Sequence, residues 1–190
     1  MWIILISALI ASILFYIYFN RDPERKIPKT GIVSPADGKV IEIITVEKKA
    51  EFGKGIGYTS FTTGFTVPVT MIRIFLNLFD VHVQRAPVEG TITEARHYPG
   101  KYAMAFKPSA WQNERAEIMI KSPKGPVKVV LVAGILARRI KLFIQNGQKV
   151  KKGERIGKIL LGSQVCVILP KCKTKLKRGQ KVQAGKTIIA

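Results

Sequence analysis

The fold is decided by the stretch Gly147-Gln-Lys-Val-Lys-Lys-Gly-Glu-Arg-Ile156, because a similar stretch occurs a second time in the chain. The second copy reads Gly179-Gln-Lys-Val-Gln-Ala-Gly-Lys-Thr-Ile188. A shorter pair of echoes lies upstream, Pro35-Ala-Asp-Gly-Lys-Val40 and Pro87-Val-Glu-Gly-Thr-Ile92. Each copy alternates a β-prone run with a glycine turn. The repeats therefore predict two similar halves, each built as strand, glycine turn and strand.

Three further runs are rich in β-branched and aliphatic residues and end at glycine, proline or charged residues: Val40-Ile-Glu-Ile-Ile-Thr-Val46, Met71-Ile-Arg-Ile-Phe-Leu76 and Val127-Lys-Val-Val-Leu-Val132. The paired echoes resemble the half-motifs of biotinyl/lipoyl-type barrels, in which two similar halves interlock. The resemblance implies a mainly β (α+β) fold, a barrel-like β sandwich over residues 31–190. A chain of 190 residues is long enough to bury a core for one such domain.

The N-terminus, residues 1–19, has no charged side chain, no proline and no glycine. As a helix it would be ~28 Å long, which is about the thickness of the hydrocarbon layer of a bilayer. A cleaved signal peptide would start with basic residues and end in small ones, whereas this segment ends in bulky aromatics. We therefore predict an uncleaved transmembrane anchor, followed by a linker over residues 20–30. The basic residues after it predict a cell-membrane protein in which the rest of the chain lies on the cytoplasmic side.

The charge of the chain points to an anionic partner. Lys and Arg number 32 against 12 Asp and Glu, a formal net charge of +20, which suits nucleic acid or an anionic membrane. The anchor favours the membrane, and no strand interleaves aromatic and basic residues as nucleic-acid binders do. We predict no nucleic-acid partner. The two cysteines fit a reducing compartment, and no metal site is predicted.

An unusual dipeptide interrupts the run from Lys158 to Pro170, which otherwise has the composition of a buried strand. Gly162-Ser163 stands in its middle, and glycine weakens a strand interior. A serine on such a kink can attack the carbonyl that precedes it and convert the amide to an ester, provided that a base takes its proton. Gly162 and Ser163 are therefore a candidate self-cleavage site.

The chain has two histidines that could supply the base. His82 follows a predicted strand, whereas His97 stands beside Arg96 and a turn and is expected on the surface. A carboxylate would orient the base. Asp37 lies in an Asp-Gly turn, and Asp80 shares a face with His82 if this stretch is extended. The residues alone leave both carboxylates open.

Several motifs occur in the order found in one enzyme family. They are Ser34-Pro-Ala-Asp-Gly-Lys-Val40, Asp80-Val-His-Val-Gln-Arg-Ala-Pro-Val-Glu-Gly90, Asn113-Glu-Arg115, Ala133-Gly-Ile-Leu-Ala-Arg-Arg-Ile140 and Leu161-Gly-Ser-Gln-Val165. With these motifs, the chain between about Arg21 and Pro170 resembles the phosphatidylserine decarboxylases, in their short prokaryotic and archaeal form.

The resemblance implies a pyruvoyl enzyme in which Asp37, His82 and Ser163 act on the chain itself. Self-cleavage between Gly162 and Ser163 would yield a β chain, residues 1–162, and an α chain, residues 163–190, which stay associated. The new N-terminal residue of the α chain would become a pyruvoyl group. That group would form a Schiff base with the serine amine of an anionic phospholipid and accept electrons while carbon dioxide leaves.

The resemblance also implies a double role for His82. Longer family members often carry a second histidine where this chain has Arg85, so His82 would serve in both self-cleavage and decarboxylation.

Three arginines are candidates for binding the headgroup: Arg85, Arg138 and Arg139. At most one of the adjacent pair, Arg138 and Arg139, should line the site. Phosphatidylserine and its ether-linked analogue, archaetidylserine, present the same headgroup, and the sequence does not separate them. The oligomeric state is open, a homodimer included.

A non-enzymatic membrane-anchored barrel, a carrier or an adaptor, is the alternative. It would explain the repeats and the anchor. A carrier needs a modifiable lysine at a hairpin tip, commonly within Met-Lys-Met or Asp-Lys-Ala, and neither tripeptide occurs. It also leaves the ordered motifs unexplained.

Overall fold

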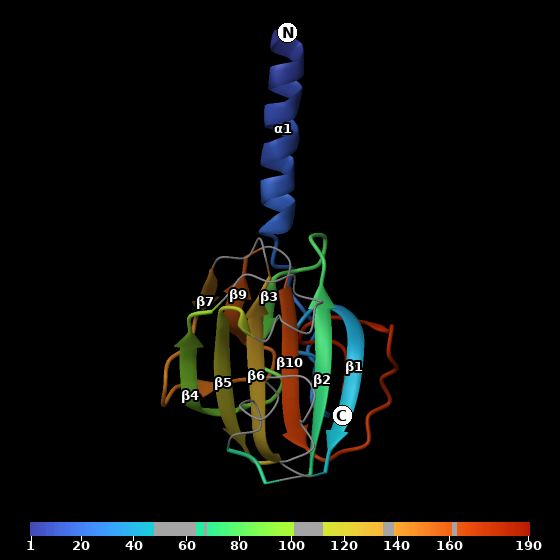
Figure 1. The fold of residues 1–190 in the computed structure, drawn as a ribbon, viewed down its shortest axis with the longest axis vertical. Coiled ribbons are helices and arrows are strands. Elements are labelled where there is room, and N and C mark those ends of the chain that lie inside the picture. Colours follow the sequence, from blue (N-terminus) through green and yellow to red (C-terminus); the bar gives the residue numbers. More distant parts are fainter. Residues whose placement is uncertain (48–63, 67, 101–111, 135–138, 161–162) are drawn as a thin grey trace.

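The structure is a computed structural model, and it describes residues 1–47, 64–66, 68–100, 112–134, 139–160 and 163–190. One helix precedes a β domain, as the sequence predicts (Figure 1). The elements are α1 (Trp2–Phe19), β1 (Gly38–Val46), β2 (Val69–Leu76), β3 (Val83–Arg85), β4 (Gly90–Tyr98), β5 (Arg115–Ser122), β6 (Gly125–Ala133), β7 (Ile140–Leu142), β8 (Lys149–Val150), β9 (Arg155–Ile159), β10 (Ser163–Pro170) and β11 (Lys181–Val182).

The strands form two sheets. The large sheet is antiparallel and curled, with the order β11-β1-β2-β10-β6-β5-β4-β8, and the small sheet has the order β3-β9-β7. The main hydrophobic core includes side chains from both sheets, among them Ile74, Leu131, Val165 and Ile159. A second cluster, which includes Met71, Val130 and Cys166, comes from the alternate residues of the same large-sheet strands. The fold is therefore the mainly β, barrel-like sandwich that the sequence predicts.

The sequence echoes pair with one another. Gly38 lies opposite Val182 in the β1–β11 pair, and Gly90 lies opposite Val150 in the β4–β8 pair. The turn glycines repeat the same bond, because Gly179 N donates to the Val40 carbonyl at 2.7 Å and Gly147 N to the Ile92 carbonyl at 2.8 Å. Each upstream echo thus forms a strand pair and a backbone hydrogen bond with one downstream echo. The two pairs are the two similar halves that the repeats predict.

Close backbone approach explains the glycine in each upstream echo. A Cβ on Gly38 would lie 2.3 Å from the Phe75 carbonyl oxygen, and one on Gly90 would lie 2.3 Å from that of Lys121. No side chain fits at such a distance. The two half-motifs therefore share a glycine for the same steric reason.

Helix α1 stands away from the domain (Figure 1). It is the one helix among the described residues that is long and apolar enough to cross a membrane. All of its side chains except Phe19 are exposed to the surroundings, as expected for a segment that faces lipid.

One expectation from the sequence is wrong. The run from Lys158 to Pro170 is not a single strand with a weak midpoint, because β9 ends at Ile159 in the small sheet and β10 begins at Ser163 in the large one. The chain passes from one sheet to the other between these two strands. Local composition could not reveal this, since the residues directly before the dipeptide, Ile159-Leu-Leu161, are as apolar as those that follow it in β10.

Candidate active site

Ser163 is the first residue of β10, at the end of the large sheet that faces α1 (Figure 1). It is fully buried and lies between its ladder partners, Leu76 of β2 and Ala133 of β6. Side chains alternate along a strand, and Val165 belongs to the main core. Ser163 therefore points into the space between the two sheets. Its hydroxyl has no hydrogen-bond partner among the described residues, and its predicted cleavage partner Gly162 lies outside them.

His82 directly precedes β3 and is also fully buried. Its Nδ1 lies 2.9 Å from the Asp80 carbonyl oxygen. A carbonyl only accepts hydrogen bonds, so Nδ1 carries the proton and Nε2 keeps a lone pair. Nε2 is buried without a partner in the part of the chain that the structure describes. The imidazole thus presents a free basic nitrogen.

Burial sets the charge state of His82. It lowers the pKa of the imidazole from 6.5 to about 4, although the bond to the Asp80 carbonyl opposes the shift. The positive charges of Lys158 and Arg21 lower the pKa further. The side chain is consequently neutral near pH 7 and ready to accept a proton.

The strand register shows which way the side chains of β3, and of His82 just before it, face. Gln84 lies opposite Gly157 of β9, and a Cβ on that glycine would meet the core side chain of Leu131 at 3.3 Å. Directly opposed residues share a face, so Gln84 also faces the core between the sheets. His82 stands two residues earlier and shares that face if the backbone stays extended. The bond from Ile159 N to the His82 carbonyl at 3.2 Å continues the ladder and supports this placement.

His82 and Ser163 thus reach the same inter-sheet space from different sheets. Leu131 of β6 lies beside Gly157 and pairs with Val165 of β10. The next pair of that ladder on the same face is Ala133 with Ser163. Within the described part of the chain, an unpaired hydroxyl and an unpaired basic nitrogen share one apolar compartment. A serine hydroxyl and a neutral imidazole that face the same apolar space are the two groups that nucleophilic catalysis uses.

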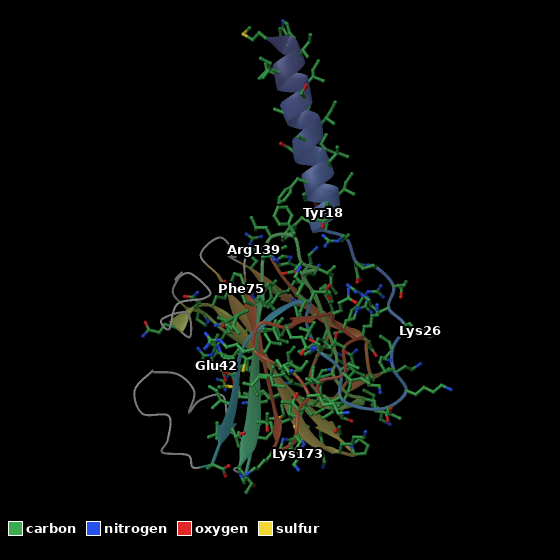
Figure 2. The ribbon with its side chains drawn as sticks, turned by 90° about the vertical axis from the view of Figure 1, so that its right-hand side faces the viewer. Tyr18, Lys26, Glu42, Phe75, Arg139 and Lys173 are labelled. Carbon is green, nitrogen blue, oxygen red and sulfur yellow. The ribbon has the colours of Figure 1, made fainter. Side chains whose placement is uncertain are left out.

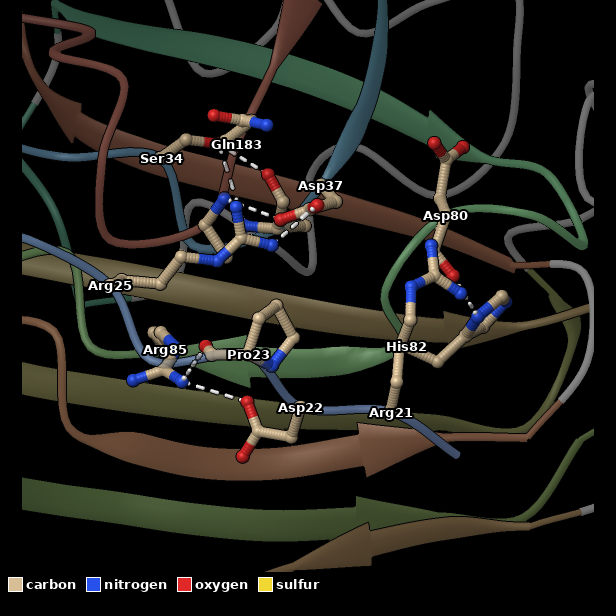
Figure 3. Close-up of polar contacts among 12 residues, drawn as sticks. Arg21, Asp22, Pro23, Arg25, Ser34, Asp37, Asp80, His82, Arg85 and Gln183 are labelled. Carbon is tan, nitrogen blue, oxygen red and sulfur yellow. Dashed lines mark hydrogen bonds and ion pairs between the residues drawn. The ribbon is translucent and has the colours of Figure 1, made fainter. Parts of the chain in front are cut away.

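Asp37 is held by other partners. Its Oδ2 accepts a hydrogen bond from Arg25 at 2.9 Å, and its Oδ1 accepts one from the Ala184 backbone at 2.7 Å. Burial raises the pKa of its carboxyl, opposed by these two bonds. Figure 3 shows the carboxylate directed at Arg25 and clearly separated from His82. Its role as the carboxylate that orients the base stays a prediction.

The alternative carboxylate, Asp80, contacts His82 through its backbone. Its side chain accepts a hydrogen bond from the Asn77 backbone at 2.8 Å and so closes the turn before His82. The main-chain carbonyl of Asp80 therefore orients the imidazole. The sequence predicts a carboxylate side chain for this role.

The three arginines differ in their surroundings. Arg85 is buried, and its guanidinium donates to the Gly153 carbonyl at 3.0 Å and to Asp22 at 2.7 Å. Arg139 is exposed, at the end of the domain nearest α1 (Figure 2). Arg138 lies outside the described residues. Of the two arginines that the structure describes, Arg139 is therefore the better placed for a headgroup at a membrane. Headgroup binding stays a prediction for all three arginines.

Gln84 is a further buried polar residue in this space, and it is not among the site residues predicted from the sequence. Both polar atoms of its amide are buried without partners among the described residues. Its position two residues after His82 was the available signal, because alternate residues of an extended segment share a face. A buried amide without partners destabilises a fold, and such groups call for a functional explanation.

We expect Gln84→Met to stabilise the protein by about 1–3 kcal/mol, because the unpaired amide is replaced by an apolar side chain of similar shape. Chemical denaturation of the detergent-solubilised chain measures this change. The exposed Gln145→Met is the control and should leave the free energy of unfolding within about 0.5 kcal/mol. A destabilised Gln84→Met protein would show that the amide has structural partners after all.

Comparisons with known proteins identify the family of the chain. The model of the family described as phosphatidylserine decarboxylase matches residues 13–190. Proteins named phosphatidylserine decarboxylase proenzyme are similar over most of the chain. The one from Chlorobaculum tepidum is 40% identical over 98% of this chain and 82% of its own length. That from Chlorobium phaeobacteroides is 41% identical, over 94% and 80%. That from Carboxydothermus hydrogenoformans is 40% identical, over 93% and 79%. The family match over nearly the whole chain, together with relatives about 40% identical over most of their own length, shows that this chain belongs to the phosphatidylserine decarboxylase family.

Proposed function

We propose that this protein decarboxylates the serine headgroup of phosphatidylserine, using a pyruvoyl group made from Ser163. One observation carries the proposal: the Ser163 hydroxyl and the His82 Nε2 are both buried in the space between the sheets and have no partner among the described residues. Two unpaired buried polar atoms cost stability and are expected where function requires them. Family membership and the relatives' printed name, which includes the word proenzyme, support both the activity and a maturation step.

The self-cleavage step uses residues of the chain alone. His82 Nε2 accepts the proton of the Ser163 hydroxyl as the oxygen bonds to the Gly162 carbonyl carbon and the C–N bond of that peptide breaks. The leaving nitrogen takes up the proton from His82, so the result is an ester and a free amine on residue 163. Elimination then removes the proton on Cα and breaks the Cβ–O bond, which leaves a carboxylate at residue 162 and dehydroalanine at residue 163. Water adds to the dehydroalanine and ammonia leaves, which produces the pyruvoyl group.

The fold is suited to holding the two products together. Strand β10 pairs with β2 from Ser163 to Pro170 and with β6 from Ser163 to Ile168. Both neighbours belong to the β chain, residues 1–162. The α chain, residues 163–190, would therefore remain clamped in the middle of the sheet after the cut, and β11 would still close on β1.

In the mature enzyme the pyruvoyl group supplies an electron sink for the departing carboxylate. The chain supplies the surroundings. The core around Ser163 excludes water, and the His82 imidazole can donate a proton at Nε2 after it has been protonated. Arg139, exposed at the end of the domain nearest α1, is our candidate for the lipid phosphate.

We place the domain on the cytoplasmic face of the cell membrane. Helix α1 is long and apolar enough to span a bilayer, and Arg21, Arg25, Lys26 and Lys29 follow it directly. The surplus of basic residues would attract anionic lipids, by ~1 kcal/mol for each residue near the surface. The ether-linked archaetidylserine has the same headgroup and is the second candidate substrate.

Intact mass measurement of the purified chain tests the proposal. We expect two fragments that meet at Gly162 and Ser163, the smaller one blocked to Edman sequencing because its terminus carries no amine. The mature protein should release carbon dioxide from phosphatidylserine in mixed micelles, and an ether-linked analogue in a parallel assay decides between the two lipids. A folded chain that remains a single uncut species would refute the proposal and favour the non-enzymatic alternative.

A further inference from the structure

The last residue of α1 leaves the lipid-facing surface and packs on the site. Phe19 is 6% exposed, whereas the rest of α1 is exposed. Its ring centroid lies 4.4 Å from that of His82, with the planes tilted by 37°. A membrane tether does not require this contact. The anchor therefore ends as part of the wall around His82.

The residues after Phe19 continue across the site, and we call residues 19–25 the junction. Asn20 accepts a hydrogen bond from Lys158 of β9 at 2.6 Å. Asp22 pairs with Arg85 of β3 at 2.7 Å, and Arg25 pairs with Asp37 at 2.9 Å. Figure 3 shows Arg25 directed at Asp37 and Asp22 directed at Arg85. Each contact joins the junction to an element that bears or adjoins a candidate site residue.

Ordering the junction costs conformational entropy, about 1–2 kcal/mol for each residue's backbone. A flexible linker would hold the domain at the membrane without that cost. The contacts therefore have a second effect, which is to fix the surroundings of the site. We propose that the junction is a structural part of the active site and that Phe19 is a positioning residue, which holds the His82 imidazole in place and keeps water from it. This inference rests on the function proposed above.

The groups around His82 determine how its imidazole responds when this cover is lost. The Phe19 ring covers one side, the Asp80 carbonyl binds Nδ1, and the charges of Lys158 and Arg21 act on the imidazole. The Asp80 carboxylate bonds to the Asn77 backbone. Desolvation is the largest cause of the lowered pKa of His82. Removal of the Phe19 ring would admit water and let the pKa rise from about 4 toward 6.5.

Histidine NMR titration of the full chain in detergent tests the inference directly. The measurement uses Ser163→Ala protein with and without Phe19→Ala, so that it requires no catalysis. The chain has two histidines, and His97 on β4, bonded to Glu114 at 2.9 Å, is the internal control. We expect Phe19→Ala to raise the pKa of His82 by about two units or more and to leave the ring signals of His97 where they are in the parent protein. Phe19→Leu, which leaves a smaller gap, should give a smaller rise in the same direction.

Self-cleavage kinetics give a second readout. An imidazole with a pKa near 6.5 is about tenfold less available as a base at pH 5.5 than at pH 7.5, whereas one near 4 changes little over that range. We expect wild type and Tyr16→Ala to cleave at similar rates at both pH values, and Phe19→Ala to slow by about four- to tenfold at the lower one, as the pKa of its His82 reaches about 6 to 6.5. Tyr16 is an aromatic of the same helix that is 69% exposed, which makes it the matched control.

The outcomes separate the two proposals. An unchanged pKa of His82 in both Phe19 variants overturns the junction inference. So does a Phe19→Ala profile equal to that of Tyr16→Ala. A wild-type chain that never cleaves refutes the proposed function instead, while the titration still reports on the junction. If Phe19→Ala does not fold, the Phe19→Leu titration decides.

Discussion

Ser163→Ala is expected to abolish both maturation and activity. Without the hydroxyl no ester can form at the Gly162 carbonyl, so the chain should remain a single uncut species by intact mass. Without the cleaved serine no pyruvoyl group arises, and release of carbon dioxide from phosphatidylserine should fall to background. The substitution removes a buried hydroxyl that has no partner among the described residues, so the fold should be retained.

A matched control separates the chemistry from the substitution itself. Ser122 lies in β5 and donates to the Gly125 carbonyl at 2.7 Å in the hairpin that joins β5 to β6. Ser122→Ala should mature normally. Carbon dioxide release by the Ser163→Ala protein would disprove the assignment of the cofactor to this residue.

His82→Ala is expected to slow self-cleavage by a factor on the order of 10²–10⁴, the usual contribution of a positioned general base. Its Nε2 is a basic nitrogen without a partner among the described residues, and it faces the same compartment as Ser163. The uncut fraction after a fixed time, followed by denaturing gel during cell-free synthesis with detergent, measures the effect. Added imidazole is expected to restore part of the rate if it can enter the space that the side chain leaves.

The control for this variant is the other histidine. His97, in β4, is nearly half exposed and pairs with Glu114, which directly precedes β5. His97→Ala should cleave at the wild-type rate. If the two histidine variants matured equally fast, His82 would have no role in self-cleavage, and another residue would have to supply the base.

Much of the site was predictable from local sequence. Ser163 stands after a glycine in an apolar run, and His82 follows a strand and precedes a proline, so both could be identified from residue type and spacing. The orientation of His82 was not predictable in the same way. Its ring is held by a backbone carbonyl of Asp80, and every residue has such a carbonyl, so no residue type marks the interaction.

Long-range pairs account for the rest of the difference. Arg25 and Asp37 were assigned to a linker and to a catalytic triad, yet they pair with each other. Arg85 was a headgroup candidate, and in the structure it binds Asp22 of the junction. Charge and residue type indicate that such groups will find partners, but the choice among many possible partners depends on the packing of the whole domain.

Contiguous residues were enough to specify the apolar N-terminal helix, the β runs, the paired half-motifs and the family to which the chain belongs. These features reflect the periodicity and composition of local segments, which the chain retains in any fold. Three-dimensional packing was needed to establish that β9 and β10, on either side of the predicted cleavage site, belong to different sheets, that Gln84 faces the core between the sheets, and that Phe19 of the anchor covers the His82 imidazole. Those contacts join residues far apart in the chain, and their energy appears only when two sheets and a helix end come together around one core.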